Sequence, residues 1–245
     1  CGRMEKELAE ASRLSGVNIV ASTGFHKMIF YRPDHWIHTI GEERLAKLFI
    51  SEIRNGMFKS TEAEIPVQIT GIKPGVIKIA SDTDGITGEY CKLFDAAVQA
   101  HAATGYPIME IVEYLTAHGV APQSIILCHL DRTVKNMEYN LEVAKTGAFL
   151  EFDTIGRFKY HSDEDEVKMI AKLVEAGAGK QLLFGLDTTR SRMKSYGGAI
   201  GLDYICDTFL PLLRTRGMGG AIDQIMVKNP QKAYSVKSIH QEVSE

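Results

Sequence analysis

The sequence lacks the marks of several large classes of protein. Its four cysteines, among 245 residues, are widely spaced and form no CxxC pair, which argues against a disulfide scaffold and is typical of a cytoplasmic protein with free thiols. No apolar stretch is long enough to span a bilayer, and no signal peptide is visible. The net charge is -3, without a basic stripe, so neither nucleic acid nor membrane is an expected partner.

Two nucleotide-binding signatures are also missing. No G-x-G-x-x-G follows a first strand, and no Walker sequence is present, which argues against a doubly wound nucleotide-binding sheet. What the chain does have is an ordinary globular composition, with 44% apolar and 24% charged residues and no break along its length. A single domain over residues 1–245 is therefore predicted.

Short apolar runs rich in β-branched residues alternate with amphipathic stretches of helical period. Strands are predicted at 17–23, 75–80, 106–108, 124–129, 147–153 and 181–187, and helices at 3–14, 42–55, 88–103, 109–118, 135–146, after Ser162, at 201–214 and at 219–228, with an irregular tail after Pro230. Such alternation implies right-handed crossovers between parallel strands. The predicted fold class is therefore α/β, with a (β/α)8 TIM barrel favoured.

The strand count does not complete that barrel. Six strands are predicted, whereas the barrel has eight. In addition, the strand at 106–108 runs directly into a helix beginning at Met109, although βα loops usually take roughly 2–6 residues. We therefore expect two strands before Cys1 and a loop between Ile108 and Met109 that the sequence does not contain.

Three polar residues, Lys78, His129 and Asp187, each end one of the apolar runs. Active sites of such barrels lie at the carboxyl ends of the strands, so the three side chains are expected on one rim. Each has a simpler interpretation: Lys78 as a solvated lysine on an edge strand, His129 as a hydrogen-bonded core residue, and Asp187 as a turn or helix cap. Their common position at strand ends favours a metal site.

Lys78 is the most telling of the three. Ile77 and Ile79 share the opposite face of its strand, so Lys78 is expected to point into the barrel. A buried ammonium costs several kcal/mol unless it is paired or chemically changed. A carbamate, formed with carbon dioxide, would turn the amine into a carboxylate able to bridge two cations.

Other strand-end residues are candidates for contacts with a substrate. They are His26, which follows Thr23-Gly24-Phe25, and Arg157 and Arg190, with Asp153 and Arg192 nearby. Surface charges or turn salt bridges explain the same residues equally well.

Six segments occur in the order seen in the phosphotriesterase family, which includes the phosphotriesterase-like lactonases of the amidohydrolase superfamily. They are Thr23-Gly24-Phe25, Gly75-Val-Ile-Lys78, Gly105-Tyr-Pro-Ile108, Cys128-His129-Leu-Asp131, Phe152-Asp153-Thr-Ile-Gly156 and Gly185-Leu-Asp187. The resemblance covers nearly the whole chain, down to Asn229-Pro230.

The resemblance implies a barrel that holds two divalent cations, usually zinc, bridged by a carboxylated lysine and a hydroxide. Lys78 matches the bridging lysine, His129 matches one of two histidines on the more exposed metal, and Asp187 matches the aspartate that binds the buried metal and moves the proton. A His-x-His pair and a further histidine of the family have no match here, and their places are the two gaps inferred above.

The leading functional hypothesis is a metal-dependent hydrolase that opens a lactone, with a sugar lactone preferred, in which Asp187 is the catalytic acid and base. A phosphotriester hydrolase is the alternative at the same site. A non-catalytic binding protein on a degenerate barrel is the alternative of a different class, favoured if the missing ligands are truly absent. The resemblance and an aromatic loop at Phe30, Tyr31 and Trp36 also predict a homodimer.

Overall fold

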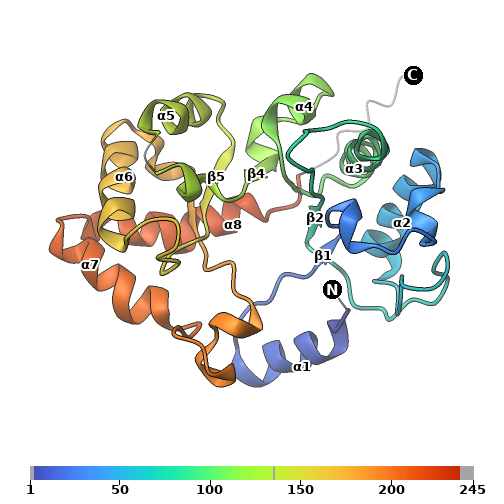
Figure 1. Cartoon of the computed structure of the whole chain (residues 1–245), viewed down its shortest axis with the longest axis horizontal. Coiled ribbons are helices and arrows are strands. Elements are labelled where there is room, and N and C mark those ends of the chain that lie inside the picture. Colours follow the sequence, from blue (N-terminus) through green and yellow to red (C-terminus); the bar gives the residue numbers. More distant parts are fainter. Residues whose placement is uncertain (1–2, 135, 238–245) are drawn as a thin grey trace. The chain divides into compact units, whose positions relative to one another are not determined.

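A computed structural model describes residues 3–134 and 136–237 (Figure 1). Contacts between residues divide the chain into two compact units. Unit 1 runs to Ala121 and resumes at Tyr234, and unit 2 spans Pro122–Ala233. Each unit is built from parallel strands that alternate with helices, and each is considered separately below.

In unit 1, three strands pair in parallel in chain order. Ser22 lies opposite Val76 in the first pair, and Ile77 lies opposite Ile108 in the second. The elements are α1 (Glu5–Ser15), β1 (Ser22–Thr23), α2 (Glu42–Asn55), β2 (Val76–Lys78), α3 (Glu89–Thr104), β3 (Ile108–Met109) and α4 (Val112–Ala117).

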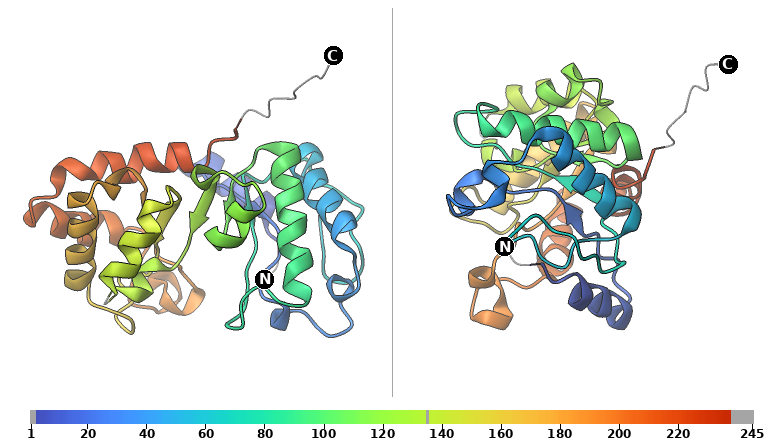
Figure 2. Two further views of the ribbon diagram at one scale, coloured as in Figure 1. Left: turned by 90° about the horizontal axis from the view of Figure 1, so that it is seen from above. Right: turned by 90° about the vertical axis from the view of Figure 1, so that its right-hand side faces the viewer.

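Helices α2 and α3 form the best-packed pair of unit 1, and Figure 2 shows them side by side. Leu45, Phe49 and Ile53 recur at helical spacing and are almost fully buried, as the amphipathic pattern predicts. Gly56, with φ 126°, ends α2 in a conformation that favours glycine. The predicted bounds of this helix, 42–55, are confirmed.

Unit 2 repeats the parallel arrangement. Ile126 lies opposite Phe149, and Leu150 lies opposite Leu182. The elements are β4 (Ile125–Leu127), α5 (Met137–Lys145), β5 (Phe149–Phe152), α6 (Asp163–Glu175), β6 (Leu182–Phe184), α7 (Leu210–Thr215) and α8 (Asn229–Ala233).

Helix α6 begins directly after Ser162, as predicted. The Ser162 Oγ accepts a hydrogen bond from the Asp165 amide at 3.2 Å, which satisfies one of the free N–H groups of the first turn. Ile170 and Leu173 then bury their side chains in the core of unit 2 against Phe152 and Phe209. The helix therefore has a fixed start and a fixed buried face.

Several boundaries differ from those predicted, and two of them change the interpretation of the chain. β3 lies at Ile108–Met109 rather than 106–108, because Pro107 has no amide to donate to a strand ladder. Glu110 and Ile111 then connect it to α4, so the direct junction expected at Met109 is not observed. The helix expected to stop near 228 continues as α8, with Pro230 in the first turn of α8, where proline is tolerated.

Two prolines explain a local irregularity in the last helices of unit 2. π-helical turns at Ile205–Phe209 and Gln224–Lys228 come just before Pro211 and Pro230. A proline donates no hydrogen bond and its ring clashes with the carbonyl four residues earlier, so a widened turn relieves the crowding.

The aromatic loop of unit 1 is only partly exposed. Trp36 is 8% exposed, and its Nε1 donates a hydrogen bond to the Thr61 carbonyl at 2.9 Å, whereas Phe30 is 64% exposed. Trp36 is buried because its indole has both an apolar neighbour in Phe25 and a hydrogen-bond acceptor. The predicted homodimer stays a prediction.

Gly24, at the end of β1, allows an unusually close approach of two strands. Its φ is +110°, and a Cβ at this position would overlap the backbone carbonyl of Lys78. We expect Gly24→Ala to lower the free energy of unfolding by about 2–4 kcal/mol, through backbone strain and overpacking. Denaturant titration checks this beside Gly220→Ala, whose added Cβ meets no atom within 4 Å. Equal midpoints for the two variants would contradict the close approach.

Candidate active site

Lys78 ends β2, with Ile77 and Ile79 fully buried on the other face of the strand, as predicted. Its side chain is 29% exposed, so the deep burial expected from the strand pattern is not observed. The Nζ donates a hydrogen bond to Glu110 Oε2 at 3.2 Å, and Glu110 Oε1 accepts from the Ser81 amide at 3.1 Å. A carboxylate at the end of β3 therefore compensates the charge of Lys78.

His26 and Lys78 line one cavity of unit 1. Its volume is about 340 Å³, and Arg3, Glu5 and Tyr31 contribute to its wall. Partial burial of the imidazole, followed by the positive charges of Lys78 and Lys27, lowers the pKa of His26. His26 therefore lies in the wall of this cavity, and its predicted contact with a substrate stays a prediction.

In unit 2, His129 follows β4 and is held by a carboxylate. Its Nδ1 lies 2.8 Å from Asp153 Oδ1, at the end of β5, and Asp153 is itself buried. Because an ionised carboxylate only accepts hydrogen bonds, Nδ1 is the donor, and in the neutral tautomer of the ring Nε2 carries the lone pair. Metal-binding histidines are usually oriented by a carboxylate in this way.

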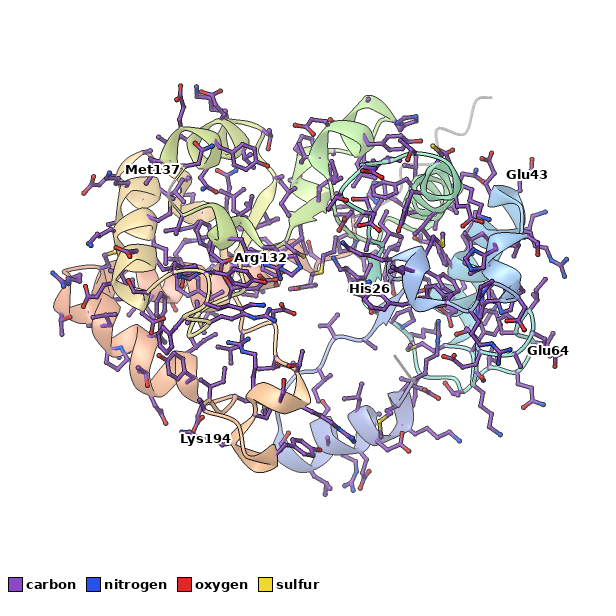
Figure 3. All side chains as sticks on the ribbon, viewed as in Figure 1. His26, Glu43, Glu64, Arg132, Met137 and Lys194 are labelled. Atoms are coloured by element: carbon purple, nitrogen blue, oxygen red, sulfur yellow. The ribbon has the colours of Figure 1, made fainter. Side chains whose placement is uncertain are left out.

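Asp187 follows β6 and is held by two arginines. Oδ2 accepts a hydrogen bond from Arg132 at 3.1 Å and another from Arg157. Arg132, labelled in Figure 3, comes from the turn after β4, and Arg157 comes from the loop after β5. Arg157, predicted to bind substrate, thus contacts the predicted catalytic carboxylate directly.

The backbone conformation is unusual at two of these residues, His129 and Asp187. Among the residues that the structure describes, His129 (φ 65°) and Asp187 (φ 40°) alone adopt a positive φ without being glycine. Such conformations cost on the order of 1–3 kcal/mol and cluster at functional sites. Both strand ends therefore carry strain where the sequence predicts chemistry.

Arg190 and Arg192 have different surroundings. Arg190 is exposed, and its guanidinium lies 5.2 Å from the ring centre of Tyr196. Arg192 donates to the backbone carbonyls of Leu186 and Asp187, and burial, with the charge of Arg157, lowers its pKa. Arg192 braces the turn that carries Asp187, whereas Arg190 contacts none of the site residues described above.

Glu110, Cys128 and Glu151 were not predicted as site residues. Glu110 lies just after β3, and correct placement of that strand would have revealed it by the strand-end rule. Cys128 and Glu151, with the predicted candidate Asp153, bring ligand atoms within 4.8 Å of one another beside His129, a grouping able to hold a metal ion. Glu151 carries no strand-end signal, because it lies inside β5.

The chain is similar in sequence and structure to known hydrolases of one family. The phosphotriesterase family profile matches residues 1–234. The phosphotriesterase homology protein of Escherichia coli (strain K12) is 32% identical over 95% of this chain and 80% of its own length. The phospho-furanose lactonase of Mycoplasmopsis synoviae (strain 53) is 31% identical over 92% and 69%. A solved lactonase from Listeria monocytogenes is 26% identical, with a TM-score of 0.85 over 97% of this chain and 79% of that one.

The chain belongs to the phosphotriesterase family. Its α/β class is confirmed, and its similarity to solved members shows that it shares the fold of the family's barrels. It is a metal-dependent hydrolase that acts on a small molecule, so the non-catalytic binding protein considered above is not supported. No described helix is both long and apolar enough to cross a membrane.

The described residues can supply some of the ligands for the metal ions of this family. In unit 2, His129 has a free Nε2 lone pair held in place by Asp153, and Asp187 has one carboxylate oxygen, Oδ1, outside its arginine contacts. In unit 1, Lys78 is positioned at its strand end, and carboxylation would require it to leave its ion pair with Glu110.

Proposed function

We propose that the protein opens a lactone, preferably a sugar lactone with an anionic substituent such as a phosphate. The observation that carries this proposal is the pair of strand-end residues His129 and Asp187, each with a strained backbone and each held by a charged partner. Lys78, as a carbamate, His129 and Asp187 would hold two divalent cations, zinc by preference. When bound, such cations polarise the scissile carbonyl and supply hydroxide at neutral pH.

Asp187 would accept the proton of the attacking nucleophile and return it to the departing alkoxide. General acid–base catalysis of this kind requires a carboxylate within hydrogen-bond reach of the reacting atoms. Arg132 and Arg157 fix the carboxylate through Oδ2 and leave Oδ1 for the proton. His129, oriented by Asp153, presents only its Nε2 lone pair.

An anionic substituent is favoured by the charges gathered around Tyr160. The side-chain charges of Arg132, Arg157 and Lys159 lie 5.0, 5.3 and 4.6 Å from its ring centre. Lys159, followed by the charges of these arginines, lowers the pKa of the phenol. Three cations around one ring form a binding surface for a phosphate or carboxylate. The phospho-furanose lactonase noted above acts on a substrate of this kind by its name.

A substrate panel tests the proposal. We expect a phosphorylated sugar lactone to be hydrolysed with a higher kcat/KM than the unphosphorylated lactone of the same ring size, and both faster than an aryl phosphotriester. Lys159→Ala should raise KM about tenfold for the phosphorylated lactone only, which corresponds to one charge-assisted contact of about 1.4 kcal/mol. Lys168→Ala, an exposed lysine on α6, is the matched control.

The phosphotriester alternative would use the same residues on a tetrahedral phosphorus centre. Markedly faster turnover of the triester would overturn the lactone assignment and leave the metal-dependent hydrolase in place. An equal effect of Lys159→Ala on both lactones would contradict the anion surface.

A further inference from the structure

A second group of ionisable residues lies entirely inside unit 2. Asp131, His161 and Glu166 have side chains that are 0%, 1% and 0% exposed. Asp131 lies in the turn after β4, His161 in the loop that precedes α6, and Glu166 in the first turns of α6. His161 Nε2 is 3.9 Å from Asp131 Oδ2, and His161 Nδ1 is 3.5 Å from Glu166 Oε2.

Three carboxylate oxygens of this cluster accept no hydrogen bond from any residue that the structure describes. They are Asp131 Oδ1 and both Glu166 oxygens. Asp131 Oδ2 does accept the Thr154 amide, and the Thr154 hydroxyl lies 3.0 Å from His161 Nε2. Buried carboxylates without donors are costly, because each lost hydration shell is worth several kcal/mol. A cation or a proton must therefore compensate the negative charges of Asp131 and Glu166.

We propose that Asp131, His161 and Glu166 bind one divalent transition-metal ion, distinct from the ions assigned to hydrolysis. Each residue offers one ligand atom, and the three atoms lie within 4.8 Å of one another. The two carboxylates carry the negative charge that one divalent ion neutralises, and the neutral imidazole adds a nitrogen ligand. This ligand set suits Zn²⁺ or Mn²⁺. His161 also lines a cavity of about 340 Å³ with Asp165 and Met169.

The ion would have a structural role. It would join the turn after β4 to the start of α6 and so fix the loop between β5 and α6, which carries Arg157. Arg157 in turn holds Asp187. The competing arrangement is a proton in place of the metal. Burial and the negative charge of Asp131 raise the pKa of Glu166 well above its usual range, so without a cation Glu166 would be a neutral acid.

Metal content separates the two arrangements. The full chain is stripped with a chelator, equilibrated with Zn²⁺ or Mn²⁺, and measured for metal bound per chain and for Tm. We expect Glu166→Gln to bind one ion fewer than the unsubstituted protein and to lose part of the metal-dependent rise in Tm. Glu164→Gln, an exposed neighbour on α6 paired with Arg216, should behave like the unsubstituted protein.

His129→Ala distinguishes this site from the proposed catalytic one. If only the catalytic assignment fails, His129→Ala leaves the metal content unchanged while Glu166→Gln still lowers it. The proposal would be overturned if Glu166→Gln bound as much metal as the unsubstituted protein and had a higher Tm at every metal concentration.

Zinc-edge anomalous scattering from crystals of the unsubstituted protein does not depend on the folding of any variant. A peak among the three side chains supports the site, and no peak there overturns it.

Discussion

Replacing Asp187 by asparagine is expected to lower kcat for lactone hydrolysis by about 10²–10⁴-fold, the usual contribution of a general acid–base group. The amide keeps the shape of the carboxylate and an oxygen for Arg132 and Arg157, but it takes up no proton at neutral pH. KM should change much less, because the lost interaction acts mainly in the transition state.

The matched control for this variant is Asp207→Asn, an exposed aspartate of unit 2. It should retain full activity. A kcat for Asp187→Asn within tenfold of the unsubstituted enzyme, with metal still bound, would contradict the proton-transfer role. Loss of metal together with activity would instead assign Asp187 chiefly to metal binding.

Replacing Lys78 by alanine is expected to reduce kcat/KM on the order of 10³-fold, because bound cations contribute several kcal/mol of charge stabilisation. The fold should persist, since Ile77 and Ile79 still bury their side chains on the opposite face of β2. Circular dichroism and lactone turnover, with Lys73→Ala as the exposed control, check both expectations. Unchanged turnover would mean that Lys78 serves only as the ion-pair partner of Glu110.

Helices were predictable where several signals agreed. Helix α2 has an apolar stripe, two glutamates in its first turn and a glycine stop, and its bounds matched the prediction. Helix α6 has a serine cap whose hydrogen bond is observed. The strands were predicted longer than they are, because an apolar run records burial and not the length of the hydrogen-bonded ladder. In the run at 17–23, only Ser22 and Thr23 pair.

The strand-end rule found His129, Asp187 and Asp153, but not which residues hold one another. Asp153, Arg132 and Glu110 come from other strand ends, and their pairing depends on how neighbouring strands line up in space. His161 and Glu166 gave no usable signal, because their burial results from packing between the 154–163 loop and the turn after β4. Sequence patterns show which residues end strands, whereas contacts between elements decide which charges are compensated.

The most direct test of the proposed site is the metal content of Lys78→Ala and Glu110→Gln beside the unsubstituted protein. Both substitutions break the ion pair, but only the first removes the amine that a bridging carbamate requires. We predict that Lys78→Ala loses the metal needed for turnover and that Glu110→Gln retains it. Full metal content in Lys78→Ala, or equal loss in both variants, would contradict the bridging role of Lys78.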